Sequence, residues 1–285
     1  MADYASSENI TNTTDEEASL GLKLKDSPVY ITFLTILVVV CVISICTNLA
    51  ITFTIFFNYS KNLKTVPNIL IANWAVADLI TLILSPIVNV GYTVLEYDSE
   101  GVIVFDFLAE FRVIFFNTSI FFALALVTDW CLASYFLKSS NQFRKYYKYV
   151  IASVWGYTLI FVCLSIGFNV TYGPFYIVPL VLTHFSYPIL AFLVVLMHFV
   201  RICKSTNNPA LTLMLATIFV VCWFEFWITM TYIIFGNLYF SFLEIPTYIP
   251  GIIIFIILYF KDQDFQTHLC IKCQRIKNIS IKAYS

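Results

Sequence analysis

Charged side chains are scarce in this 285-residue sequence. They make up 12% of it, against about 25% in soluble domains. Hydrophobic residues make up 60%, and the 28 Phe and 18 Tyr would leave large apolar patches on a surface that faced water. A soluble globular domain is therefore excluded, and the composition indicates a protein embedded in a bilayer. The net charge is −1 and no basic stripe is present, which excludes nucleic-acid binding as well.

Several other features are absent from the sequence. It has no low-complexity segment, no repeat and no matched pair of interrupted apolar segments, which disfavours a transporter built from repeats. It has no Gly-x-Ser-x-Gly element, no paired catalytic aspartates and no histidine-rich metal motif, so we expect no catalysis. Residues 1–28 lack an apolar core behind a basic start, so we expect no cleaved signal peptide.

Long apolar stretches dominate what remains. A helix needs about 20 predominantly apolar residues to cross the hydrocarbon core, and seven stretches meet that requirement. The sequence therefore predicts an all-α membrane protein with a seven-transmembrane helix bundle. The seven predicted spans are Val29–Phe57, Pro67–Tyr92, Gly101–Leu137, Tyr149–Gly167, Pro174–Val200, Pro209–Phe235 and Tyr239–Phe260.

The distribution of positive charge predicts the orientation. With the amino terminus outside, 13 of the 16 Lys and Arg residues lie in inside segments, as the positive-inside rule requires. Residues 1–28 are acidic and carry glycosylation sequons at Asn9 and Asn12, and a third sequon begins at Asn169. We expect a disordered, glycosylated outside tail over 1–28, the bundle over 29–260 and an inside tail over 261–285, in a multi-pass protein of the plasma membrane.

The inside tail and the cysteines suggest lipid contacts. No cysteine lies in an outside loop, so no extracellular disulfide is expected. Cys270 and Cys273 lie just after the last span among basic residues, where S-palmitoylation is favoured over a metal or redox role. The tail mixes apolar and basic residues, which suits an amphipathic helix on the anionic inner leaflet.

Short motifs occur in a fixed order along the spans. In chain order they are Thr47-Asn48-Leu49-Ala50, Ala75-Val76-Ala77-Asp78-Leu79, Asp129-Trp130-Cys131-Leu132-Ala133, Trp155, Pro188, Cys222-Trp223-Phe224-Glu225-Phe226 and Tyr259. Together they resemble the elements of the rhodopsin-like (class A) G-protein-coupled receptors: Gly-Asn-x-x-Val, Leu-Ala-x-Ala-Asp-Leu, Asp-Arg-Tyr-Leu-Ala, the fourth-helix Trp, the fifth-helix Pro, Cys-Trp-x-Pro-Phe and Asn-Pro-x-x-Tyr. The resemblance covers nearly the whole chain after residue 28.

The departures from that family fall at functional positions. Trp130 replaces the arginine of Asp-Arg-Tyr, Glu225 replaces the sixth-helix proline, and Phe255-Ile256 replaces the Asn-Pro before Tyr259. In the family that arginine moves from its aspartate to the G protein on activation, and a tryptophan cannot make such a charge-assisted contact. Loss of the proline predicts a straighter sixth helix. Asp129, Trp130 and Tyr259 are the expected G-protein-facing residues, and whether a heterotrimeric G protein couples is left open.

The intramembrane carboxylate Asp78 calls for a partner or a function, because an unpaired charge in the bilayer is costly. The resemblance implies a sodium ion held by Asp78 and Ser119 next to Asn48. No other cofactor is expected. The alternative is a protonated Asp78 that hydrogen-bonds Asn48 and Ser119.

Arg112 precedes Ser119 by seven residues and shares its helical face, about 10 Å nearer the outside. The resemblance places it at the depth of the ligand pocket, where amine receptors carry an aspartate. We therefore expect an extracellular ligand that is a peptide rather than an amine, in a pocket formed by Arg112, Trp223, Glu225, Phe226 and Glu244. The alternative is an internal ion pair between Arg112 and either Glu244 or Glu110.

Three functions stay open at this point. The first is an atypical receptor that signals through G proteins. The second is a receptor that does not couple, and instead scavenges ligand or pairs with another receptor. The third is a cation or proton transporter or channel that uses Asp78, Ser119 and Glu225.

Overall fold

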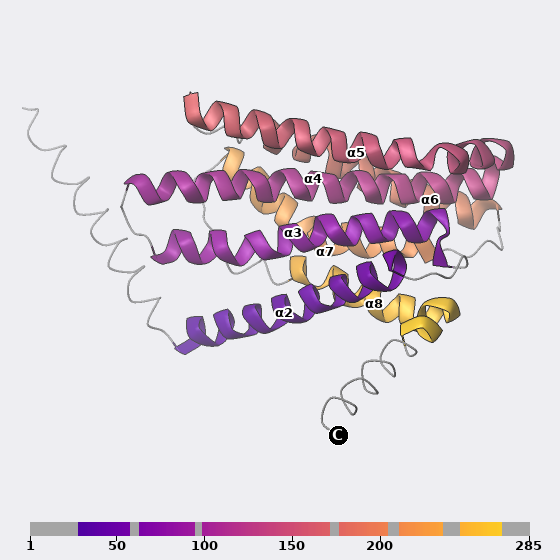
Figure 1. Ribbon diagram of the computed structural model, residues 1–285, viewed down its shortest axis with the longest axis horizontal. Helices are drawn as coiled ribbons and strands as arrows, with labels where there is room; N and C mark the ends of the chain where they lie inside the picture. The colour runs from indigo at the N-terminus through magenta and orange to yellow at the C-terminus, as the bar shows by residue number, and fades with distance from the viewer. Residues whose placement is uncertain are drawn as a thin grey trace, which may run out of the picture. The chain divides into compact units, whose positions relative to one another are not determined.

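Helices make up nearly all of the computed structural model, which describes residues 28–57, 63–94, 99–171, 177–204, 211–235 and 246–269 (Figure 1). Six of the helices are long and apolar enough to cross a membrane, which confirms the prediction of an all-α chain of membrane-protein type. In chain order the helices are α2 (Pro28–Phe56), α3 (Val66–Val94), α4 (Ser99–Tyr135), α5 (Leu137–Thr171), α6 (Ile177–Lys204), α7 (Leu211–Phe235) and α8 (Pro250–Lys261).

The clearest disagreement with the sequence prediction concerns the start of α5. The fourth span was predicted to begin at Tyr149, whereas the helix that contains it begins at Leu137. Only Phe136 separates it from α4, and its amide still donates to the Leu132 carbonyl at 2.9 Å. The basic stretch before the predicted span is therefore helical. Hydropathy detects only the apolar part of a helix, while polar turns also form helix when one face packs.

The seventh predicted span is represented by a short helix. α8 has 12 residues, about 18 Å at 1.5 Å per residue, which is less than the roughly 30 Å hydrocarbon core. It begins at Pro250, where a missing amide proton costs nothing. Most of the residues from 239 to 249 lie outside the described part, so a seventh crossing stays a prediction.

A further short helix follows α8 at residues 263–269. Asp262 caps it, since its Oδ1 accepts a hydrogen bond from the Phe265 amide at 3.0 Å. Phe265 is 1% exposed and meets the Phe255 ring edge-on at 6.0 Å. The most apolar side chain of this helix is therefore buried in the protein.

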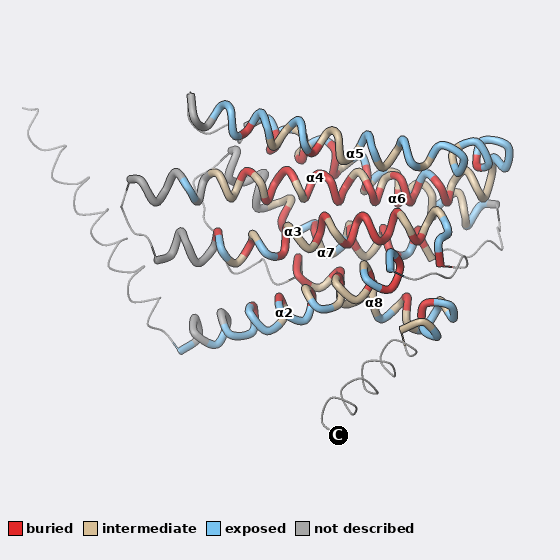
Figure 2. Tube along the Cα trace, in the orientation of Figure 1, coloured by how far each residue is buried: buried red, intermediate tan, exposed pale blue. Residues whose placement is uncertain are grey.

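Packing is centred on α4. Residues 43–285 form one compact unit and residues 1–42 a separate one. Within the former, α4 packs against α3, α5, α6 and α7. Buried residues concentrate along α3 and α4, whereas much of α5 is exposed (Figure 2). Side chains on α4 therefore meet those of most other helices.

Hydrogen bonds between side chains join α4 and α3 to their neighbours. The Asn117 amide donates to the Thr183 hydroxyl of α6 at 2.7 Å and accepts from Ser186 at 3.1 Å. Trp155 of α5 donates to Asn73 of α3 at 2.9 Å. Helices in lipid gain nothing from excluding water, so such bonds and close packing hold them together.

The contacts between α6 and α7 are of the same kind. The Tyr187 hydroxyl donates to the Val220 carbonyl, and His198 shares a 2.8 Å hydrogen bond with Thr217. α7 continues without interruption through Glu225 and contains no proline, and its predicted straightness stays a prediction.

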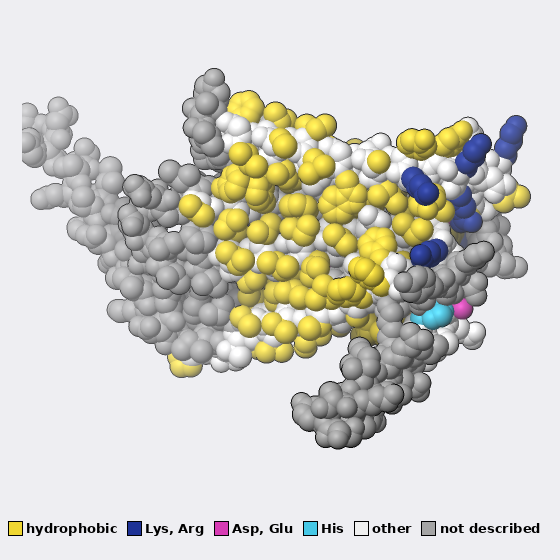
Figure 3. All heavy atoms as spheres, in the orientation of Figure 1, with side chains coloured by type: hydrophobic (Ala, Val, Ile, Leu, Met, Phe, Trp, Pro, Cys, Tyr) yellow, Lys and Arg dark blue, Asp and Glu magenta, His cyan; other side chains and the backbone are white. Residues whose placement is uncertain are grey.

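The outward surface suits hydrocarbon. Figure 3 shows a face covered mostly by apolar side chains, with Lys and Arg gathered at one end. α6 presents a stripe at helical spacing that faces outward, and its members are Phe185, Ile189, Phe192, Val195, Phe199 and Ile202. A continuous apolar stripe of this length is typical of a helix in contact with lipid.

Candidate functional site

A polar cluster joins the first two helices of the predicted bundle. Asn48 of α2 donates through Nδ2 to Asp78 Oδ2 of α3 at 3.1 Å, and to the Ser44 carbonyl of its own helix at 3.1 Å. Asn48 is 2% exposed and Asp78 is 3% exposed. Asn48 and Asp78, which belong to two separate sequence motifs, are thus adjacent in space.

Gly251 of α8 lies against this cluster. A Cβ atom at position 251 would be 2.3 Å from Asn48 Nδ2 and 3.0 Å from Ser44 Oγ, closer than atoms that are not hydrogen-bonded approach each other. α8 therefore reaches α2 at this level only because residue 251 has no side chain. This role of Gly251 was missed in the sequence, because a close approach between helices leaves no local pattern.

The surroundings of Asp78 agree with the two sequence-based hypotheses in the Asn48 contact only. Both hypotheses also placed Ser119 against Asp78, and the described residues show no hydrogen bond between these two side chains. Its Oδ2 is bonded to Asn48, while Oδ1 and the nearby Ser44 hydroxyl are buried without hydrogen-bond partners among the described residues. A carboxylate oxygen with a neighbouring hydroxyl suits either a hard cation or a proton. The Ser119 hydroxyl, 1% exposed, donates to the Phe115 carbonyl of α4 at 3.3 Å.

A second cluster combines a cation with aromatic rings between α4 and α7. The Arg112 guanidinium carbon lies 5.0 Å from the centroid of the Phe226 ring, and Arg112 is 5% exposed. Phe116, one turn further along α4, stacks on Trp223 at 4.2 Å. Phe226 meets both rings edge-on, at 5.0 and 5.2 Å. An arginine packed on a desolvated ring is a favourable cation–π contact.

Two features of this cluster bear on ligand binding. Trp223 is 2% exposed, and its indole N–H is buried without a hydrogen-bond partner among the described residues. The carboxylate of Glu110 accepts a hydrogen bond from Ser165 of α5, and the Arg112 guanidinium lies over the Phe226 ring of α7. Glu225 is half-buried on α7, and Glu244 lies outside the described residues.

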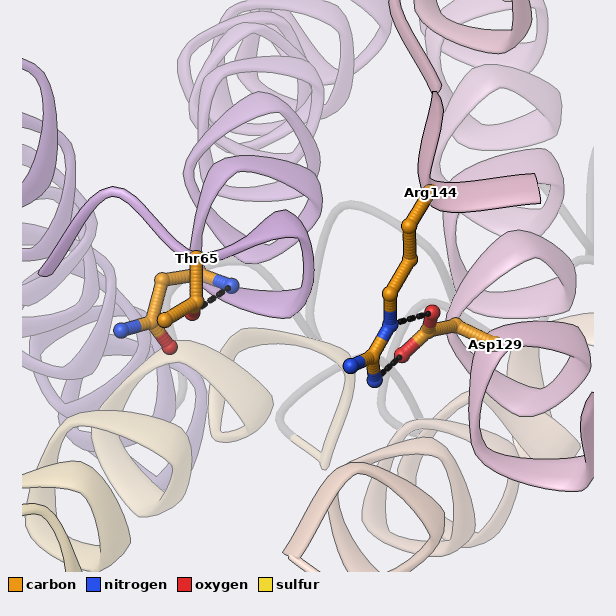
Figure 4. Close-up of polar contacts among 4 residues, drawn as sticks. Thr65, Asp129 and Arg144 are labelled. Atoms are coloured by element: carbon orange, nitrogen blue, oxygen red, sulfur yellow. Dashed lines mark hydrogen bonds and ion pairs between the residues drawn. The ribbon is translucent and has the colours of Figure 1, made fainter. Parts of the chain in front are cut away.

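The third cluster is an ion pair between α4 and α5 (Figure 4). Arg144 donates from Nε to Asp129 Oδ1 at 2.9 Å and from a terminal nitrogen to Oδ2 at 3.0 Å. This bidentate geometry is the strongest form of the arginine–carboxylate contact. The Asp129 side chain is 2% exposed and the Arg144 side chain 43% exposed. Trp130 replaces the family's arginine next to Asp129 in the sequence, but a different arginine, Arg144 of α5, binds Asp129 in the structure.

The two neighbours expected at the inner face are aromatic. Trp130 is 4% exposed and meets Tyr135 edge-on at 6.0 Å. Its indole N–H has no hydrogen-bond partner among the described residues. Tyr259 of α8 is half-buried and stacks on Phe255 at 6.4 Å.

The predicted modification sites are scarcely covered by the structure. Asn9, Asn12, Cys270 and Cys273 lie outside the described residues. Asn169 lies in the last turn of α5, which continues to Thr171. Glycosylation and palmitoylation therefore remain predictions.

The two clusters that include α4 residues occupy different levels of that helix. Arg112 and Asp129 are 17 residues apart in the sequence, which corresponds to about 25 Å along a helix, and Ser119 lies between them.

No protein-family model matches the chain, and no curated protein is a significant match. The function of these clusters is therefore inferred from their chemistry and from the motif resemblance.

The close approach at residue 251 leads to a first prediction. Gly251→Ala should lower the free energy of unfolding by about 1–3 kcal/mol, because the new methyl group must displace Asn48. Thermal unfolding of the purified protein in detergent measures this loss. The matched control is Gly156→Ala in α5, where a Cβ meets nothing within 4 Å. We expect that variant to be as stable as the wild type or slightly more stable, since alanine favours helix.

A double variant tests the cause. Asn48→Ala removes the side chain that the new methyl group would strike, so Gly251→Ala should cost much less in that background. Equal costs of Gly251→Ala in both backgrounds would contradict the proposed clash.

The ion pair leads to a second prediction. Arg144→Ala should lower the free energy of unfolding by about 1–3 kcal/mol, because it leaves the buried Asp129 carboxylate without its bidentate partner. Screening at the half-exposed arginine keeps the loss below that of a fully buried pair. Lys148→Ala, one turn further along α5, is the exposed control and should change little.

The same measurement on Asp129→Asn and on the double variant completes a cycle. We expect the effect of Arg144→Ala to shrink in the Asp129→Asn background. Strictly additive losses would mean that the pair contributes nothing to stability.

Proposed function

We propose that this chain is an atypical rhodopsin-like receptor with seven transmembrane helices, and that it binds an extracellular ligand. The observation that carries the proposal is the cluster of Arg112, Phe226, Phe116 and Trp223 between α4 and α7. A buried cation beside aromatic rings, one of which has an unsatisfied N–H group, is suited to a ligand with an acidic and an aromatic part. The Asn48–Asp78 hydrogen bond is a second support, because it joins two positions that the motifs matched separately.

The orientation in the proposal puts the amino terminus outside the plasma membrane and the carboxyl terminus inside. It is supported by the Lys and Arg side chains gathered at one end of the molecule (Figure 3) and by the positive-inside rule. Asp129 and Arg144 then lie at the cytoplasmic end, and Arg112 lies about 25 Å away toward the outside.

The ligand in this proposal is a peptide rather than an amine. An arginine at pocket depth repels a cationic amine and attracts a carboxylate, which it binds through two N–H groups. Trp223 would form the floor of the pocket, and Glu225 and Glu244 would contact basic groups of the ligand. In the proposal Asp78 holds either a sodium ion or a proton, on the cytoplasmic side of the ligand pocket.

Coupling is the most distinctive part of the proposal. Asp129 is already engaged by Arg144, and the buried Trp130 occupies the position of the family's arginine. Signalling through a G protein would then be weak in the native chain. The alternative, favoured by the same two residues, is a receptor that does not couple and acts by taking up ligand or pairing with another receptor.

A third prediction separates the two versions. In cells that express the chain, Trp130→Arg should raise G-protein activation above the wild-type level in at least one G-protein class, because it restores the arginine next to Asp129. Combining it with Arg144→Gln should raise activation further, since the native arginine no longer competes for the carboxylate. Subunit dissociation measures activation at matched surface expression.

Trp130→Phe is the control, because it removes the indole without adding a charge and should stay at the wild-type level. If no variant activates any class of G protein, the result contradicts coupling and supports the receptor that does not couple. Ion flux through the protein in liposomes would contradict both versions and favour a channel or transporter.

A further inference from the structure

The first three turns of α5 have two different faces. Residues 138, 142, 145 and 149 are spaced by four, three and four, which places them on one side of a helix. All four are exposed, and they are Lys138, Gln142, Lys145 and Tyr149. The opposite side carries Ser140, which is buried, and Arg144, which binds Asp129. The ion pair thus fixes which side of α5 points away from the bundle.

The outward side carries uncompensated positive charge. Residues 137–149 contain four basic residues and no acidic one. Arg144 is neutralised by Asp129, so three lysines remain, and Lys148 is exposed beside the other two. Tyr146 is 46% exposed and lies 5.5 Å from Lys145 Nζ, while Tyr149 is 70% exposed.

Helix length places this segment at the membrane surface. α5 has 35 residues, about 52 Å, against a hydrocarbon core of roughly 30 Å. Its apolar part, residues 150–168, is about 28 Å long and exposes Leu159, Ile160 and Leu164 to the surroundings. Residues 138–149 therefore extend into the headgroup layer, where lysine and tyrosine side chains are favoured.

We propose that the face of α5 formed by Lys138, Gln142, Lys145 and Tyr149, with Lys148 at its edge, binds the headgroups of anionic phospholipids in the adjoining leaflet. The lysines neutralise phosphate and carboxylate groups, Gln142 supplies an amide donor, and the exposed tyrosines lie at the boundary with the acyl chains. The face continues into the lipid-exposed apolar surface of the same helix, which favours a membrane lipid over a soluble acidic protein. The inference does not depend on the receptor function.

The experiment measures lipid binding to the full chain in a neutral detergent. Phosphatidylserine and phosphatidylcholine are titrated separately, and bound lipid is counted by native mass spectrometry. The test variant is Lys138→Gln/Lys145→Gln/Lys148→Gln. The matched control removes the same charge from other helices and their flanks, and it is Lys64→Gln/Arg201→Gln/Lys261→Gln. A third variant, with arginine at positions 138, 145 and 148, keeps the charge.

We expect the wild type to prefer phosphatidylserine. The test variant should bind it at least tenfold more weakly, since each lysine near a headgroup contributes a substantial attraction, while phosphatidylcholine binding stays unchanged. The control and the arginine variant should stay near the wild type. Equal binding of the two lipids would overturn the proposal, as would an equal loss in the control, which would indicate diffuse charge attraction. Unchanged thermal unfolding of the test variant excludes misfolding as the cause of lost binding.

Discussion

Polar side chains in a bundle surrounded by hydrocarbon have only one another and the backbone as partners, and the packing of this chain follows from that constraint. Asn117 engages α6, Asn73 engages α5, and Asp78 engages α2. Each contact sets the rotation of a helix about its own axis, because the partner lies on one side only. α4 contacts four other described helices, so errors in its rotation would disrupt several of these pairs at once.

The sequence predicted those parts of the fold that depend on local hydrophobicity. Runs of apolar residues located α2, α3, α4, α6 and α7 to within a few residues, since a helix in lipid must be apolar along most of its length. The motif positions also predicted that Asn48 and Asp78 lie together. Contacts made by polar segments at helix ends could not be located in this way, because a charge run is equally compatible with a solvated loop.

Arg144 shows what such reasoning misses. In the sequence Arg144 is one of four basic residues in a polar stretch, and nothing in that stretch shows that it is the one that binds Asp129. The helical spacing of residues 138, 142, 145 and 149 was the available signal, because it places residue 144 on the opposite side. Gly251 was missed for a different reason. Its role depends on how closely α8 approaches Asn48, which is a property of packing and not of pattern.

The two faces of α5 are coupled by the geometry of the helix. A helix turns about its axis as a rigid body and keeps fixed angles between its side chains, so α5 cannot turn enough to release Asp129 while its lysines keep their direction. Headgroup binding on one face, as proposed, would therefore stabilise the ion pair on the other, because a ligand that favours one arrangement shifts the population toward it. If the chain acts as proposed, the position at which rhodopsin-like receptors carry their coupling arginine responds to the charge of the surrounding lipid. The bidentate contact between Arg144 and Asp129 would transmit that response, because it joins the basic end of α5 to α4.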